Sequence, residues 1–136
     1  HEDFGSHKCY TLGEKQFLDL FSANDPQSSR MLLEETFPDR EDLTIIYNHR
    51  SDRQDRLLLF IRYFFPQVRC RKIIVIGEGR WFAKLRLQRA GLPCVETAAS
   101  WSKALSQADT PVVVGIGNIK GQGYEMVEHA ESGDMI

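Results

Sequence analysis

The chain has 136 residues, of which 42% are hydrophobic and 26% are charged, with a formal net charge of -2. This length and composition suit one ordinary globular domain with a sizeable core and exclude disordered and fibrous classes. The net charge does not favour binding to nucleic acid or to an anionic membrane, although local basic clusters remain possible. No apolar run has the length of a membrane span or the pattern of a signal peptide.

Short apolar runs alternate with amphipathic runs, which predicts strands that alternate with helices. The first predicted strand covers residues 16–23, after which Asp25 and Pro26 suit the cap and first turn of a helix. The second strand covers residues 43–47, and residues 51–54 resemble a capping box that opens the next helix. The apolar face expected for that helix consists of Leu57, Leu58, Phe60, Ile61, Phe64 and Phe65.

The second half of the chain repeats this alternation. We expect three more strands, at residues 72–76, 94–97 and 112–115, and three more helices, at residues 80–90, 100–107 and 124–129. The pattern predicts an α/β fold, with a Rossmann-like, mostly parallel sheet of five or six strands and helices on both faces.

Polar residues follow the first predicted strand, and open α/β sheets bind ligands at the carboxyl ends of their strands. Asn24 and Asp25 suit a capped helix start. They equally suit contact with ribose hydroxyls or a phosphate-bound metal, because a helix N-terminus offers free amides and a positive dipole end to an anion. The spacing alone does not separate these two interpretations.

The end of the second strand is rich in arginine. Arg50, Arg53 and Arg56 stand beside Asp52 and Asp55 at a helix start. Such a segment is either a solvated face with internal ion pairs or a site for an anionic ligand. We favour the site, because guanidinium groups bind carboxylate and phosphate oxygens in a bidentate manner.

Two glycine-rich segments follow later strands. Residues 77–79 lack the remaining glycines of a dinucleotide-binding loop, so that interpretation is weak. Residues 115–123 contain four glycines, which suits either a flexible turn or a loop whose amides approach a ligand. Lys120 in this segment suits either a phosphate contact or a surface position.

Four segments, in this order, resemble the carboxy-terminal domain of the poly-γ-glutamate synthetase, or capsule ligase, family, which belongs to the Mur ligase group. They are residues 21–29, 48–56, 74–78 and 114–121. The resemblance covers about residues 20–127, and the ordered set is far more specific than any single motif.

The resemblance implies the third domain of an ATP-dependent amide ligase, in which an amine attacks an acyl-phosphate and glutamate is joined through γ-amide bonds. By similarity, Arg53 holds the carboxylate of the incoming amino acid, a role that suits an arginine fork at a helix start. The other implied substrate-binding residues are Asn48, Arg50, Asp52, Arg56, Gly117 and Asn118. The implied nucleotide-binding residues are Asn24, Asp25 and Ser28.

The chain also departs from the family. Lys120 stands where histidine is expected, and the Gly-Lys-Ser/Thr phosphate loop is missing from these residues. We therefore expect no catalytic residue and no metal ligand here, and a fragment that is inactive alone. ATP and Mg are expected to bind mainly to the N-terminal and central domains. Residues 1–15 are assigned to an interdomain hinge remnant, residues 16–130 to the Mur-ligase-like domain and residues 131–136 to a flexible tail.

The remaining partners that the resemblance implies are glutamate or a poly-γ-glutamate chain and the subunits of a membrane complex, with no nucleic acid. Three widely spaced cysteines without a CxxC pair favour a reduced, cytoplasmic compartment. The resemblance implies a position at the inner membrane face, reached through other segments or partners.

Two alternatives belong to other classes of protein. One is a stand-alone module that binds glutamate or a nucleotide without catalysis. The other is a flavodoxin-like or receiver-like regulatory domain, for which Asp25 is one candidate acid, although the arginine-rich strand end argues against an acidic pocket.

Overall fold

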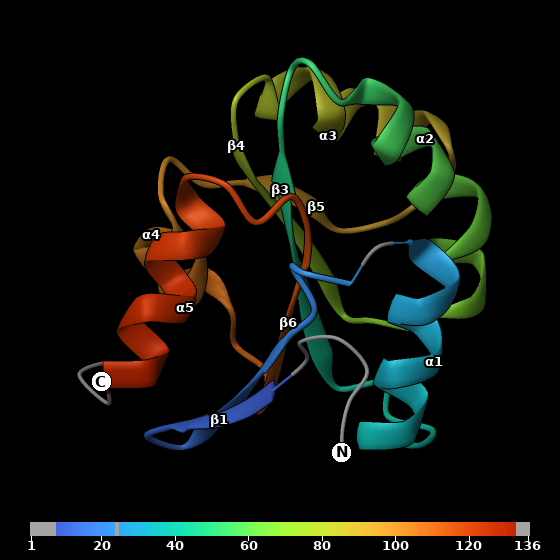
Figure 1. The fold of residues 1–136 in the computed structure, drawn as a ribbon. Helices are drawn as coiled ribbons and strands as arrows, with labels where there is room; N and C mark the ends of the chain where they lie inside the picture. Colours follow the sequence, from blue (N-terminus) through green and yellow to red (C-terminus); the bar gives the residue numbers. More distant parts are fainter. Residues whose placement is uncertain (1–7, 24, 133–136) are drawn as a thin grey trace.

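A computed structural model describes residues 8–23 and 25–132, built around one six-stranded sheet in the order β1-β2-β6-β3-β4-β5 (Figure 1). β1 pairs with β2 in antiparallel fashion, and every other pair in the sheet is parallel. The strands are β1 (Lys8–Leu12), β2 (Lys15–Asp19), β3 (Leu43–His49), β4 (Lys72–Gly77), β5 (Val95–Thr97) and β6 (Val112–Gly117).

Helices cover both faces of this sheet. α1, α2 and α3 pack on one face and α4 and α5 on the other, as Figure 1 shows. The helices are α1 (Pro26–Thr36), α2 (Gln54–Tyr63), α3 (Arg80–Arg89), α4 (Trp101–Gln107) and α5 (Gln122–Ser132), and a short 3-10 turn, Phe65–Gln67, follows α2. The predicted Rossmann-like α/β fold is confirmed.

The alternation of side chains along each strand explains the two layers. In β3, Ile45 and Tyr47 point into the core under α1, α2 and α3, whereas Ile46 points into the core under α4 and α5. All seven residues of this strand are buried, which is why its apolar pattern is nearly continuous.

The connections place a ligand site between β3 and β6. These strands are neighbours in the sheet, but the chain leaves β3 toward α2 on one face and leaves β6 toward α5 on the other. Their loops therefore diverge at the carboxyl edge, and such a switch point is where open α/β sheets bind ligands.

Several predicted boundaries are wrong by a few residues. β3 continues through His49, so residues that were expected in a loop belong to the strand. The predicted capping box at residues 51–54 is wrong, because residues 50–53 form a turn in which Arg53 N donates to Arg50 O at 3.0 Å. α2 then begins at Gln54 without a side-chain cap.

Both terminal segments of the chain contain more regular structure than the sequence predicts. Residues 8–12 of the predicted hinge segment form the edge strand β1, and α5 continues through Ser132, the second residue of the predicted tail. Residues 13 and 14 form the turn to β2, which begins at Lys15, and only residues 1–7 and 133–136 of these two segments lie outside the described ones. Within the described ranges, no helix is long and apolar enough to span a bilayer.

Candidate functional site

A pocket of about 470 Å³ opens at the carboxyl ends of β3, β4 and β6. Three cationic side chains line it, one after each strand: Arg50, Arg80 and Lys120. Glu78 is the one carboxylate in the lining, so positive charge dominates among the described residues there. The full lining is Asn48, His49, Arg50, Gly77, Glu78, Arg80, Ala99, Lys120, Gly121 and Gln122. This pocket suits an anionic ligand.

Asn48 holds the loop after β6 against the end of β3. Its side-chain amide donates to Asn118 O at 2.7 Å and to Lys120 O at 2.9 Å. Asn118 returns two bonds to Asn48 O, from its backbone N–H at 3.0 Å and its side-chain amide at 3.1 Å. Asn48 is 1% exposed and Asn118 6% exposed. The amides of both predicted substrate-binding residues are thus used inside the protein, where they position Lys120.

Gly117 is required by close packing at the same strand end. Its φ is +98°, a region that favours glycine, and an added Cβ would lie 2.7 Å from Asn48 O. A side chain here would push β6 away from β3. The glycine predicted to line the substrate therefore has a steric role in forming the edge of the pocket.

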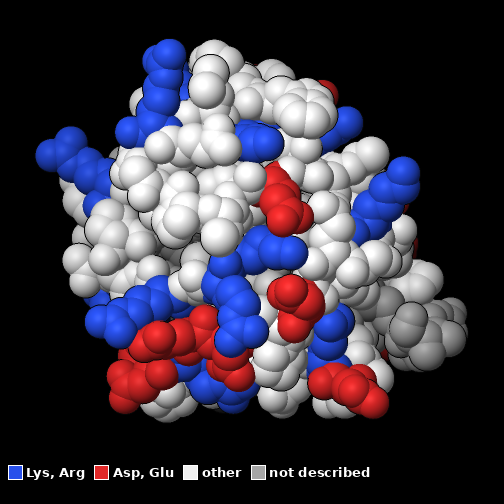
Figure 2. Space-filling model, turned by 180° about the vertical axis from the view of Figure 1, so that it is seen from behind, with Lys and Arg blue, Asp and Glu red and all other residues white. Residues whose placement is uncertain are grey.

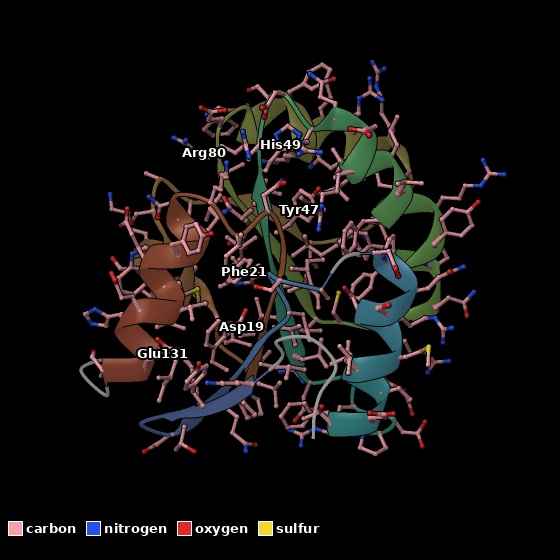
Figure 3. The ribbon with its side chains drawn as sticks, in the orientation of Figure 1. Asp19, Phe21, Tyr47, His49, Arg80 and Glu131 are labelled. Carbon is pink, nitrogen blue, oxygen red and sulfur yellow. The ribbon has the colours of Figure 1, made fainter. Side chains whose placement is uncertain are left out.

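His49 sits at the base of the pocket and is 1% exposed. Its Nδ1 lies 2.7 Å from the backbone oxygen of Glu78, which can only accept, so Nδ1 carries the proton. This bond ties the end of β3 to the turn after β4 that leads to Arg80. Figure 3 shows His49 and Arg80 at the same end of the sheet.

The predicted arginine cluster divides into three different environments. Arg50 lines the pocket and pairs with Asp52 at 2.8 Å, with its side chain 27% exposed. Arg53 is exposed and forms the N-cap position of α2. Arg56 turns the other way, and its Nη2 donates to Ala23 O at 3.1 Å. Of the three arginines, Arg50 alone is in the lining formed by the described residues.

Three buried side-chain atoms have no hydrogen-bond partner among the described residues. They are Tyr47 Oη, His49 Nε2 and Arg56 Nε. All three belong to the end of β3 or the start of α2. Burial is the main cause that raises the pKa of the Tyr47 hydroxyl. The rings of Tyr47 and His49 are neighbours, with centroids 6.2 Å apart.

The start of α1 is a capped helix end. Asp25 Oδ1 accepts from Ser28 N at 2.7 Å, and Ser29 Oγ donates to Asp25 O at 3.1 Å. Asp25 and Ser28, predicted to contact a nucleotide, therefore contact each other, while Asn24 lies outside the described residues. No group of three or more His, Cys, Asp or Glu among residues 8–23 and 25–132 is arranged to hold a metal ion.

A second pocket, of about 620 Å³, has the opposite charge. Asp19, Glu128 and Glu131 line it with Lys8 and Tyr10. Burial raises the pKa of Asp19 to about 6, and burial together with Glu131 raises the pKa of Tyr10 to about 12. Figure 3 shows Asp19 and Glu131 well away from His49 and Arg80. An anionic ligand fits the first pocket and not this one.

Sequence reasoning missed Arg80 and His49 as site residues. Arg80 follows the weak glycine motif of residues 77–79, and its position after the third parallel strand was the available signal. Its guanidinium lies 3.5 Å from Gly77 O. His49 is a lone histidine in a charged segment, and such a residue carries little information by itself. Neither residue could be placed without knowing that β3, β4 and β6 end together.

Comparisons with known proteins agree with this fold. The chain matches the family model described as poly-gamma-glutamate synthase CapB C-terminal domain over residues 9–133. The capsule biosynthesis protein CapB of Bacillus anthracis is 26% identical over 147 residues, which cover 94% of this chain and 31% of that protein.

A solved structure of folylpolyglutamate synthase from Thermotoga maritima has the same fold, with a TM-score of 0.73 at 17% identity. The match covers 99% of this chain and 32% of that chain. This chain thus spans about a third of each relative. The predicted resemblance to the carboxy-terminal domain of the capsule ligase family, within the Mur ligase group, is confirmed. The chain belongs to the family of poly-gamma-glutamate synthase CapB C-terminal domains.

Proposed function

We propose that this chain is the domain of an ATP-dependent ligase that binds glutamate while it is joined through a γ-amide bond. The observation that carries the proposal is the convergence of Arg50, Arg80 and Lys120 on one pocket at the switch point of the sheet. Family membership supports the same reaction, because the family model is described as a poly-gamma-glutamate synthase domain.

The pocket chemistry suits a substrate with two carboxylates. A guanidinium holds a carboxylate through two parallel hydrogen bonds, and a lysine adds a point charge. We assign Arg50 and Arg80 to the carboxylates of the glutamate unit and Lys120 to a third anionic contact. With its carboxylates fixed, the amine of the incoming amino acid stays free and oriented for attack. Arg53, at the rim of the same turn, assists as the domain closes.

Asn48 and His49 are positioning residues in this proposal. Asn48 holds the backbone of Lys120, and His49 holds the backbone of Glu78, two residues before Arg80. Both side chains are buried, so they fix the geometry of the cations without exposing much of their own polar surface. This arrangement holds the backbone that carries two of the three cations in place before a ligand arrives, which reduces the entropy lost on binding.

ATP would supply the phosphoryl group that activates a carboxylate for attack by an amine. The start of α1 does not fit its phosphates well, because the Asp25 carboxylate already accepts from the free amide of Ser28. We infer that ATP and Mg are held mainly by the rest of the ligase, which lies outside the 31% of the relative that this chain matches. Asp25 and Ser28 would then be the residues of this chain that hold the ribose hydroxyls.

The test is ADP release by the protein that contains this chain at its full natural length. We expect release that requires glutamate and forms a γ-linked product, and no turnover by residues 1–136 alone. Glutamine, which lacks the second carboxylate, serves as the matched substrate control and should support little release. Glutamate binding without any ADP release would favour the stand-alone binding module, and equal rates with glutamine would contradict the carboxylate assignment.

A further inference from the structure

The outer side of α3 carries large apolar side chains although α3 is also packed into the core. Ala83 and Leu87 are buried against the sheet, whereas Trp81 is 64% exposed, Leu85 47% and Phe82 45%. At 100° per residue, these three exposed side chains share the side of the helix that faces away from the core. A helix that only covers a sheet needs no such residues on its outer side.

α2 has the same unusual surface. Leu58 is 46% exposed, Leu59 45% and Tyr63 40%, so Leu58 does not belong to the buried face predicted for it. α2 and α3 pack on the same face of the sheet. Among the described residues, they carry six of the eight large hydrophobic side chains that are exposed. A gathered set of this kind marks an interaction surface, whereas scattered single residues do not. We name these six residues of α2 and α3 the outer helix face.

Cations border the outer helix face. α3 contains Arg80, Lys84, Arg86 and Arg89 and no acidic residue. Lys84 Nζ lies 5.7 Å from the centre of the Trp81 ring, and Arg86 Cζ lies 5.1 Å from that of Phe82. On α2, Arg62 Cζ lies 5.6 Å from the centre of the Tyr63 ring. Each of these aromatic rings thus has a cation beside it.

The face of the molecule drawn in Figure 2 has a matching distribution of charge. Figure 2, seen from behind, shows mostly Lys and Arg around an uncharged area in the upper part, where α2 and α3 lie, and most Asp and Glu lower down. The formal net charge of the chain is -2, so the positive charge of this surface is local. A local basic and aromatic surface attracts an anionic partner that also accepts apolar groups.

We propose that the outer helix face binds the surface of a membrane that contains anionic lipids. Trp, Tyr, Phe and Leu side chains enter the boundary between headgroups and acyl chains, and Lys and Arg beside them reach the lipid phosphates. A hydrophilic polyanion such as polyglutamate would satisfy the cations and leave the six apolar side chains in water. The apolar residues also stand on the outer side of a helix rather than in a groove, which suits insertion into lipid. This contact goes beyond the ligase activity.

The experiment is sedimentation of the protein, at its full natural length, with vesicles of phosphatidylcholine alone or of equal parts phosphatidylcholine and phosphatidylglycerol. We expect binding to the mixed vesicles that weakens as salt is added, and little binding to the neutral ones. Lys84→Glu should weaken binding by about tenfold or more, since each basic residue near the surface contributes substantially. Trp81→Ser should weaken it to a similar extent.

Two matched control variants lie on the opposite face of the sheet. Lys103→Glu on α4 makes the same charge change, and Tyr124→Ser on α5 removes an aromatic side chain that is 57% exposed. Both should bind vesicles like the unchanged protein. The proposal is overturned if the unchanged protein stays in the supernatant when the mixed vesicles sediment. It is also overturned if Lys84→Glu and Lys103→Glu have equal effects on binding. Binding to an acidic protein without binding to vesicles would overturn it as well.

Discussion

Asn48 and Asn118 donate hydrogen bonds to each other's backbone oxygens, across the ends of β3 and β6. Asn48 Nδ2 donates to Asn118 O at 2.7 Å, and Asn118 N donates to Asn48 O at 3.0 Å. This reciprocal bonding sets the loop that carries Lys120 into the pocket. The polar residues that the sequence places at these strand ends thus shape the site before they contact any ligand.

Asn48→Asp is expected to destabilise the fold more than Asn48→Ala. Asn48 donates two buried hydrogen bonds to carbonyls, and a carboxylate would face both carbonyls with no proton to donate. We expect Asn48→Ala to cost about 2–3 kcal/mol in the free energy of unfolding, measured by urea denaturation. Asn118→Ala, which removes one side-chain bond, should cost less. A loss for Asn48→Asp no larger than that for Asn48→Ala would contradict this account.

Asp19 should make stability fall as the pH rises from about 4 to about 6. Burial raises its pKa from 3.8 to about 6, so between these values the folded protein holds a proton that the unfolded chain has released. The resulting loss in the free energy of unfolding is complete above pH 6 and amounts to at most about 3 kcal/mol. Urea denaturation of the unchanged protein at several pH values measures this slope.

Asp19→Asn tests the same point. The amide oxygen can still accept from Phe21 N, a bond of 3.0 Å, but the buried charge is gone. We expect the variant to be more stable than the unchanged protein at pH 7.5 and to show no gain at pH 4. A gain of the same size at both pH values would show that the charge of Asp19 is not its cause.

Gly115→Ala is expected to destabilise the protein through a clash with Phe21. An added Cβ would lie 2.5 Å from two ring atoms of Phe21, although the backbone at Gly115 is ordinary. Overpacking of this kind costs about 1–3 kcal/mol. Phe21→Leu should recover part of that loss in the double variant, which thermal unfolding of all four proteins would measure. Additive losses would argue against this contact.

Tyr47→Phe should leave the free energy of unfolding unchanged or raise it. The Tyr47 hydroxyl is buried without a partner among the described residues, so its removal relieves a desolvation cost of about 1–3 kcal/mol. The ring still packs edge-on against Phe60, with centroids 5.7 Å apart. Urea denaturation measures the change. A loss above about 1 kcal/mol would show that the hydroxyl has a partner in solution.

The fold could be predicted from the sequence because its signals are local. The β-branched run of β4 and the cap at Asp25 depend on neighbouring residues and appear where they were expected. The end of β3 could not be predicted, since Asn48 and His49 are polar and read as loop residues. Their place in the strand depends on pairing with Gly117 of β6 and Gly77 of β4, which are distant in sequence.

The candidate site could be predicted only in part, because it too depends on contacts between residues that are distant in sequence. The sequence pattern indicates an arginine-rich site, but it does not distinguish the positions of Arg50, Arg53 and Arg56. The turn before α2 points Arg50 to the pocket and Arg56 to Ala23, and the sequence pattern carries no sign of that turn. Arg80 was missed because its contribution depends on β4 lying next to β3.

The proposed function requires the cationic pocket to bind the carboxylates of glutamate. The most direct test is the kinetics of glutamate ligation by the full-length protein with Arg50→Gln, compared with Arg69→Gln. Arg69 is a matched arginine, 78% exposed, that pairs with Glu41 outside the pocket. We predict that Arg50→Gln raises the KM for glutamate by about tenfold or more, because a charge-assisted bond is lost, with little change in the KM for ATP. Arg69→Gln should change neither. Equal changes in both KM values, or none for Arg50→Gln, would contradict the account.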